Sequence, residues 1–129
     1  VLVIDKGGFV LAHCDQLKSF DLTTIGALAS GAYLANQTIA GLVNEENFSS
    51  VYQQGEKFSM LIMNINENSL LVIIFAAELS VGAIKFYAVR AIQRIAAQMK
   101  TAWERDPSSG MDLSVLNLEN PDVVFRKKA

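Results

Sequence analysis

The 129-residue chain has few residues that could carry out chemistry. It contains one histidine, His13, and one cysteine, Cys14, which are too few for the usual zinc site or for an internal disulfide. Adjacent strand residues point to opposite faces, so these two side chains cannot easily form a catalytic pair. We therefore predict no catalytic residue, no metal and no cofactor. A lone thiol also fits a reducing compartment, which predicts a cytoplasmic location.

Charge is scarce as well. Charged residues make up 19% of the chain, and the net charge is −2. Nucleic-acid binding needs a basic face, so we predict no nucleic-acid partner. The sequence contains no Gly-x-x-x-x-Gly-Lys-Ser/Thr phosphate loop, and no basic-then-apolar signal segment opens it. With 51% hydrophobic residues and this length, the chain predicts one globular domain with a substantial core.

The order of apolar runs and turns predicts the fold. Glycines in Asp5-Lys6-Gly7-Gly8 supply the positive φ of a hairpin turn, and Asp21 is a suitable N-cap for a long helix. The succession of elements predicts an α/β (α+β) fold: a five-stranded, mainly antiparallel sheet with helices on both faces. We expect residues 1–106 to form the domain and residues 107–129 to be a linker and tail that folding does not require. The expected elements are strands at 1–4 and 9–12, a helix at 22–43, strands at 48–53, 58–65 and 69–75, and a helix at 81–105.

The helix expected at residues 22–43 contains no Asp, Glu, Lys or Arg. A surface helix of an ordinary monomer has a charged outer face. Placed at 100° per residue, its side chains divide into one side that can face the sheet and a second side of small or apolar residues. The residues expected to face the sheet are Ile25, Leu28, Ala32, Ala35, Ile39 and Val43; those on the second side are Thr23, Ala27, Ser30, Gly31, Leu34, Thr38 and Gly41.

Three explanations of that second side stay open. The helix could be a weakly polar one on a monomer. A membrane span of about 20 residues has the right length, but Asn36, Gln37 and three threonines disfavour it, and we predict no membrane span. A protein interface, including self-association, is the favoured explanation. The strand expected at 48–53 contributes because no proline blocks its edge. The residues expected to bind a partner or a second copy are Ala27, Ser30, Gly31, Leu34, Thr38, Phe48, Val51 and Tyr52.

Several sequence pieces occur in the order and at the spacing of a known family. They include the first hairpin at residues 2–13, Leu28-Ala29-Ser30-Gly31, the turn at residues 52–56, the run at residues 70–75, and Gly82 with Lys85. With these pieces the chain resembles the Roadblock / dynein light-chain superfamily, in particular its bacterial MglB-type members (gliding-motility protein B). The resemblance runs from Val1 to about Arg105.

The resemblance implies a function. Family members are homodimers or heterodimers in which the central helices pair and the strands corresponding to residues 48–53 join two sheets. They also have a helix before the first strand, which suggests that this chain is a fragment. MglB-type members bind a small Ras-like GTPase that controls cell polarity and stimulate its GTP hydrolysis. A homodimeric GTPase regulator in polarity or gliding motility is therefore expected, with a plain scaffold subunit and a ligand-sensing α/β domain as alternatives.

The position of the arginines indicates a mechanism. An arginine finger must lie beside the surface that binds the partner. Three of the four arginines, Arg90, Arg94 and Arg105, fall on the last helix, which we place across the sheet from the uncharged helix; Arg126 falls in the tail. We therefore expect stimulation of GTP hydrolysis without an arginine finger, by preferential binding of one conformation of the GTPase.

Overall fold

The computed structural model describes residues 1–14 and 20–105, so the expected linker and tail at 107–129 lie outside the described residues. It divides into two compact units, the first spanning Val1–Ile92, and the division falls inside the last helix. Element types agree with the sequence prediction, and most boundaries differ by one or two residues. The elements are β1 (Leu2–Asp5), β2 (Val10–His13), α1 (Leu22–Leu42), β3 (Ser50–Gln53), β4 (Phe58–Asn66), β5 (Ser69–Ala76) and α2 (Val81–Arg105).

The strands form one five-stranded sheet in the order β2-β1-β5-β4-β3. Every neighbouring pair is antiparallel, including the long-range pairing of β1 with β5. The predicted α+β fold with a five-stranded antiparallel sheet is confirmed. Strands β2 and β3 form the two edges of this sheet.

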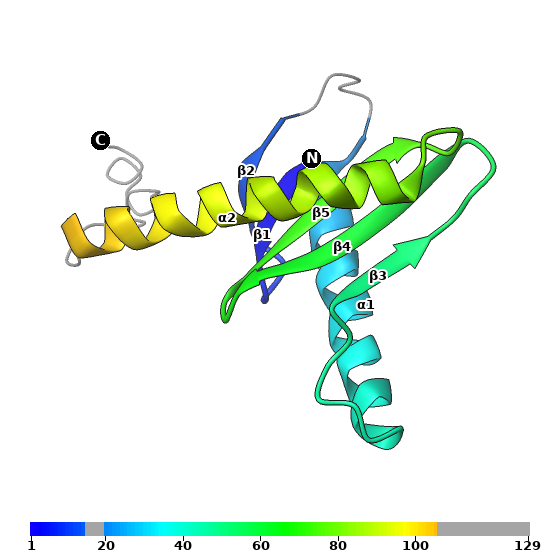
Figure 1. Cartoon of the computed structure of the whole chain (residues 1–129), viewed down its shortest axis with the longest axis horizontal. Coiled ribbons are helices and arrows are strands. Elements are labelled where there is room, and N and C mark those ends of the chain that lie inside the picture. Colours follow the sequence, from blue (N-terminus) through cyan, green and yellow to red (C-terminus); the bar gives the residue numbers. More distant parts are fainter. Residues whose placement is uncertain (15–19, 106–129) are drawn as a thin grey trace. The chain divides into compact units, whose positions relative to one another are not determined.

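Strand β5 is an almost continuous apolar run, because both faces of the sheet are covered. Helix α1 packs against one face, and residues 81–92 at the start of α2 lie over the other (Figure 1). Leu71 of β5 and Ala88 of α2 are both buried. The hydrophobic core between α1 and the sheet is formed by Leu2, Ile4, Ala29, Tyr33, Ile62, Leu70 and Val72.

Both ends of α1 have the local chemistry that a helix end requires. Asp21 is the N-cap: its carboxylate accepts a hydrogen bond from the Thr24 hydroxyl at 2.6 Å and one from the Thr24 N–H at 3.1 Å. These bonds stabilise the ionised form and lower the pKa of Asp21. At the other end Asn44 adopts a left-handed φ of 64°, and the Glu45 N–H donates back to the Ala40 carbonyl, so the chain leaves the helix in a Schellman-type turn.

Candidate interaction surface

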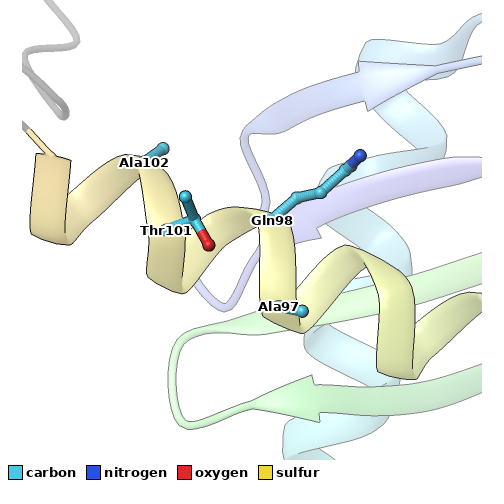
Figure 2. A pocket seen from close by; sticks show the side chains of 4 residues that line it. All are labelled: Ala97, Gln98, Thr101 and Ala102. Carbon is cyan, nitrogen blue, oxygen red and sulfur yellow. The ribbon is translucent and has the colours of Figure 1, made fainter.

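The described residues offer little for catalysis. Residues 1–14 and 20–105 contain no group of three or more His, Cys, Asp or Glu side chains that could hold a metal ion. A shallow surface depression on α2 is lined by Ala97, Gln98, Thr101 and Ala102 (Figure 2). These side chains carry no titratable group, and all four come from a single helix. The depression therefore gives no basis for a catalytic site.

Membrane crossing was the second explanation offered for the uncharged helix. None of the helices in the described part of the chain combines the length and apolar character needed to cross a bilayer.

The side of α1 that faces the sheet is not the one that its large apolar residues predicted. The buried residues of the helix are mostly small: Gly26, Ala29, Ser30, Tyr33 and Ala40. Leu28, Ile39 and Val43 were expected to face the sheet, but these side chains are exposed, and so is Ala35. The predicted sheet-facing side is therefore wrong for these four residues, whereas Ile25 and Ala32 are partly buried as expected.

Close backbone packing explains this orientation. A Cβ atom on Gly26 would lie 3.0 Å from the Gly8 carbonyl oxygen, and a Cβ on Gly8 would lie 2.9 Å from the Ala27 Cα. The helix thus rests almost backbone to backbone on the turn between β1 and β2. Only small side chains fit next to this contact, so Leu28 turns away from the sheet, whereas Tyr33 further along the helix is buried in the core.

Ser30 belongs to this packed side and not to the exposed side where the sequence placed it. It is only 4% exposed, and its hydroxyl donates a hydrogen bond to the Lys6 carbonyl in the β1–β2 turn. The nearby Tyr33 hydroxyl donates to Asn64 Oδ1 at 3.4 Å, and burial raises the pKa of Tyr33. Ser30 therefore fixes α1 to its own domain, which corrects its prediction as an outward-facing residue.

The opposite side of α1, here called the outer face, is exposed and uncharged. Three leucines carry most of its apolar surface: Leu28 is 68% exposed, Leu34 51% and Leu42 79%. The space in front of Gly31 and Gly41 is open, since a Cβ there would meet no described atom within 4 Å beyond the neighbouring backbone of the helix itself. The outer face comprises Thr24, Ala27, Leu28, Gly31, Leu34, Ala35, Thr38, Ile39, Gly41 and Leu42.

Polar side chains on α1 form hydrogen bonds within the chain. The Thr38 hydroxyl donates to the Leu34 carbonyl at 3.2 Å, and Asn36 Nδ2 donates to the Ala32 carbonyl at 2.8 Å. Gln37 Nε2 donates to the Phe48 carbonyl at 3.3 Å, which holds the segment before β3 against the helix. These bonds lower the cost of desolvating the helix surface, because a partner need not replace every hydrogen bond to water.

The predicted site residues fall in three places. Ala27, Gly31, Leu34 and Thr38 lie together on the outer face, as placed from the sequence. Ser30 is buried beneath them. Phe48, Val51 and Tyr52 lie in and before the edge strand β3.

The three residues near β3 have different surroundings. Phe48 is half-buried and precedes the strand, which begins at Ser50 and not at Phe48 as predicted. Val51 is half-buried and packs against the core. Tyr52 is 37% exposed, and its ring stacks on the Phe75 ring, with centroids 6.3 Å apart and planes 11° apart. Among the described strands it pairs with β4 alone, so its other edge is free of any of them.

Sequence reasoning missed the exposed residues Leu28, Ile39 and Leu42 as candidates for binding. The positions of Gly8 and Gly26 in the sequence could have indicated that these three residues are exposed. A glycine in a hairpin turn and a glycine in the first part of a helix are both compatible with a close backbone approach. That approach places Gly26 against the sheet and so turns Leu28 to solvent.

Comparisons with known proteins agree with this fold. The sequence profile of the Roadblock/LC7 domain matches residues 1–75. The chain is 33% identical to an MglB with a tetrameric arrangement, with a TM-score of 0.70, over 74% of this chain and 73% of that one. It is 34% identical to the gliding protein MglB of Thermus thermophilus, with a TM-score of 0.69 and the same coverage of both chains.

A more distant structure shares the fold alone. Myxococcus xanthus MglB is 23% identical, with a TM-score of 0.72, over 78% of this chain and 81% of that one. A comparison with curated proteins gave no match.

Proposed function

The chain belongs to the Roadblock/LC7 domain family, and from this premise we propose that it is a dimeric, cytoplasmic regulator of a small Ras-like GTPase, acting in cell polarity or motility. The similarity to MglB proteins at 33% and 34% identity supports this proposal. The single observation that carries it is the outer face of α1, an uncharged helix surface with three exposed leucines.

Such a surface suits a protein partner. Soluble monomers rarely expose contiguous apolar patches larger than a few hundred Å² unless the patch has a function. The small residues Ala27 and Gly31 let another backbone approach closely, while Leu28 and Leu34 on either side provide apolar area to bury. The outer face therefore combines a close-contact centre with apolar flanks.

The free edge of β3 is the second element of the proposed dimer. It offers unpaired backbone groups to a second copy. We expect the protein to sediment as a dimer at micromolar concentration, and we expect Val51→Pro to raise the dimer dissociation constant by roughly tenfold. The reason is that proline removes a backbone N–H and disrupts edge pairing, at about 0.5–1.5 kcal/mol for each lost hydrogen bond.

Ala12→Pro is the matched control, because it places proline in the other edge strand, β2. Circular dichroism establishes that both variants are folded before sedimentation equilibrium is measured. A wild-type protein that stays monomeric at high concentration, or an equal loss of dimer in both folded variants, would contradict the proposed dimer.

For the mechanism, we propose that stimulation needs no arginine finger. Arg90 lies on α2, where its guanidinium carbon is 5.9 Å from the centroid of the Phe86 ring. The start of this helix lies over the sheet face opposite α1 (Figure 1). The outer face would then stimulate hydrolysis by packing more tightly against one conformation of the GTPase than against another. The GTPase's own groups would carry out the hydrolysis.

We expect each of Arg90→Ala, Arg94→Ala, Arg105→Ala and Arg126→Ala to keep most of the stimulation in a single-turnover GTP hydrolysis assay. Loss of a true arginine finger lowers the rate by about a thousandfold or more. A drop of that size in one variant, with GTPase binding intact, would show that this mechanism is wrong. Binding with no change in hydrolysis by the wild-type protein would instead indicate a scaffold subunit.

A further inference from the structure

Lys6 is a basic residue at the border of the outer face of α1. It lies in the β1–β2 turn, and its carbonyl accepts the hydrogen bond from the buried Ser30 hydroxyl. Residues three and four apart are neighbours on a helix surface, so Ser30 adjoins Ala27 on one side and Leu34 on the other. Both of these are exposed residues of the outer face. Lys6 therefore lies beside the close-contact centre of that surface.

Three contacts hold Lys6 in this position. Its N–H donates a hydrogen bond to the Asn68 carbonyl in the β4–β5 turn at 2.9 Å, and its carbonyl accepts the bond from Ser30. Its Nζ atom lies 5.7 Å from the centroid of the Tyr33 ring, a cation–π distance. Tyr33 itself is buried in the core. Both the backbone and the side chain of Lys6 are thus fixed against α1.

The charge of Lys6 has no acidic partner within the described part of the chain. Asp5 is the adjacent acid, but its Oδ1 accepts the N–H groups of Gly7 and Phe9, both at 2.9 Å, and so stabilises the turn. Among residues 1–14 and 20–105 the Lys6 ammonium contacts the Tyr33 ring and forms no ion pair. Helix α1 has no charged residue of its own. Lys6 therefore brings an uncompensated positive charge to the rim of an uncharged surface.

We propose that Lys6 pairs with an acidic side chain of the GTPase when the GTPase packs on the outer face, and that this pair contributes to specificity. The inference rests on the proposed function and adds the chemistry of the partner's surface. A charge at the rim of an apolar contact speeds association and disfavours partners with a positive charge at that place. Because its contacts hold Lys6 at the helix surface, the anion it meets is a carboxylate of the GTPase and not a phosphate of GTP.

Lys57 provides a matched control, because it is an exposed lysine at the other end of the sheet. It precedes β4, whereas Lys6 is bonded to the turn that follows β4. The nine residues of this strand separate the two lysines by about 30 Å. Lys6→Glu and Lys57→Glu change the net charge of the protein equally, so a difference between them reports the position of the charge.

Stopped-flow association with the GTPase tests the pairing. We expect Lys6→Glu to slow association by roughly tenfold at low ionic strength, and the difference to shrink in about 0.5 M salt, because salt screens the charges. Lys57→Glu should slow it by less than about twofold. Lys6→Met keeps an apolar stem over the Tyr33 ring without the charge and should slow association about threefold, whereas Lys6→Arg should keep the wild-type rate.

Single-turnover hydrolysis at saturating concentrations separates a carboxylate partner from a phosphate. Lys6→Met should keep the hydrolysis rate within about twofold of wild type once the complex has formed, because a rim pair acts on association. A drop of about a thousandfold would show that Lys6 reaches the nucleotide as a finger does, and would overturn the inference.

Circular dichroism establishes that each variant is folded, and Lys6→Met serves as the test if Lys6→Glu does not fold. Wild-type association by folded Lys6→Met, or equal slowing by Lys6→Glu and Lys57→Glu, would overturn the inference and leave the proposed function intact. Failure of the wild-type protein to bind the GTPase would refute the proposed function, and the inference with it.

Discussion

Gly31→Arg is expected to abolish binding of the small GTPase while the domain keeps its fold. A Cβ at position 31 would meet no described atom within 4 Å beyond the neighbouring backbone of its own helix, so there is room for the longer side chain. Arginine also favours a helix interior by up to about 1 kcal/mol relative to glycine. At the centre of a close contact, however, an uncompensated buried charge costs about 3–5 kcal/mol, which corresponds to a loss of affinity of a hundredfold or more. Isothermal titration calorimetry measures this loss.

Ala27→Arg should have a similar effect, because Ala27 is the neighbouring exposed small residue on the outer face. Gly82→Arg is the matched control: it adds the same side chain to an exposed glycine in the first turn of α2. Sedimentation of each variant shows whether self-association is lost together with GTPase binding. Wild-type affinity in both outer-face variants would show that the GTPase binds elsewhere.

Gly8→Ala is expected to lower the free energy of unfolding by about 2–4 kcal/mol. Gly8 has a φ of 98°, a conformation that residues with a Cβ rarely adopt. The added Cβ would also lie 2.9 Å from the Ala27 Cα, a backbone atom that cannot move aside alone. Strain of this kind and overpacking each cost about 1–3 kcal/mol. For a domain of this size, thermal unfolding should shift down by roughly 10–25 °C.

The adjacent Gly7→Ala is the control. Its added Cβ would lie 3.3 Å from Asp5 Oδ1 and 3.8 and 3.9 Å from two ring atoms of Phe9, all of them side-chain atoms, and its φ is not in the left-handed region. We expect a shift of a few degrees at most. Similar melting temperatures for Gly7→Ala and Gly8→Ala would show that the close approach of α1 to the β1–β2 turn contributes little to stability.

The element order was predictable because each piece has a local cause. Asp21 caps α1 with the bonds that its side chain chemistry favours, and the glycine turn produces the first hairpin. The apolar runs of β4 and β5 show that both faces of the sheet are covered. These features depend on neighbouring residues, so the sequence alone is enough to place them.

The orientation of α1 was not predictable in the same way. Periodicity locates a buried face through the contrast between polar and apolar residues. Helix α1 has no charged residue, so this contrast is weak. The size of the apolar side chains is then the remaining indication of which side is buried, and it favours the wrong residues. The helix packs through Gly26, Ala29 and Ser30, because a backbone approaches there; this tertiary contact cannot be seen in the helix sequence. Leu28 is consequently exposed where the sequence predicted it to be buried, and Ser30 is buried where the sequence predicted it to be exposed.

Leucine methyl NMR spectra test most directly whether the outer face of α1 receives the GTPase. The protein is labelled at its leucine methyl groups and titrated with a GTP-bound small Ras-like GTPase from the same cell. The methyl resonances of Leu28 and Leu34 are expected to shift or broaden, while those of Leu79, which is exposed before α2, stay in place. Shifts at Leu79 with Leu28 and Leu34 unchanged would contradict the proposed interface.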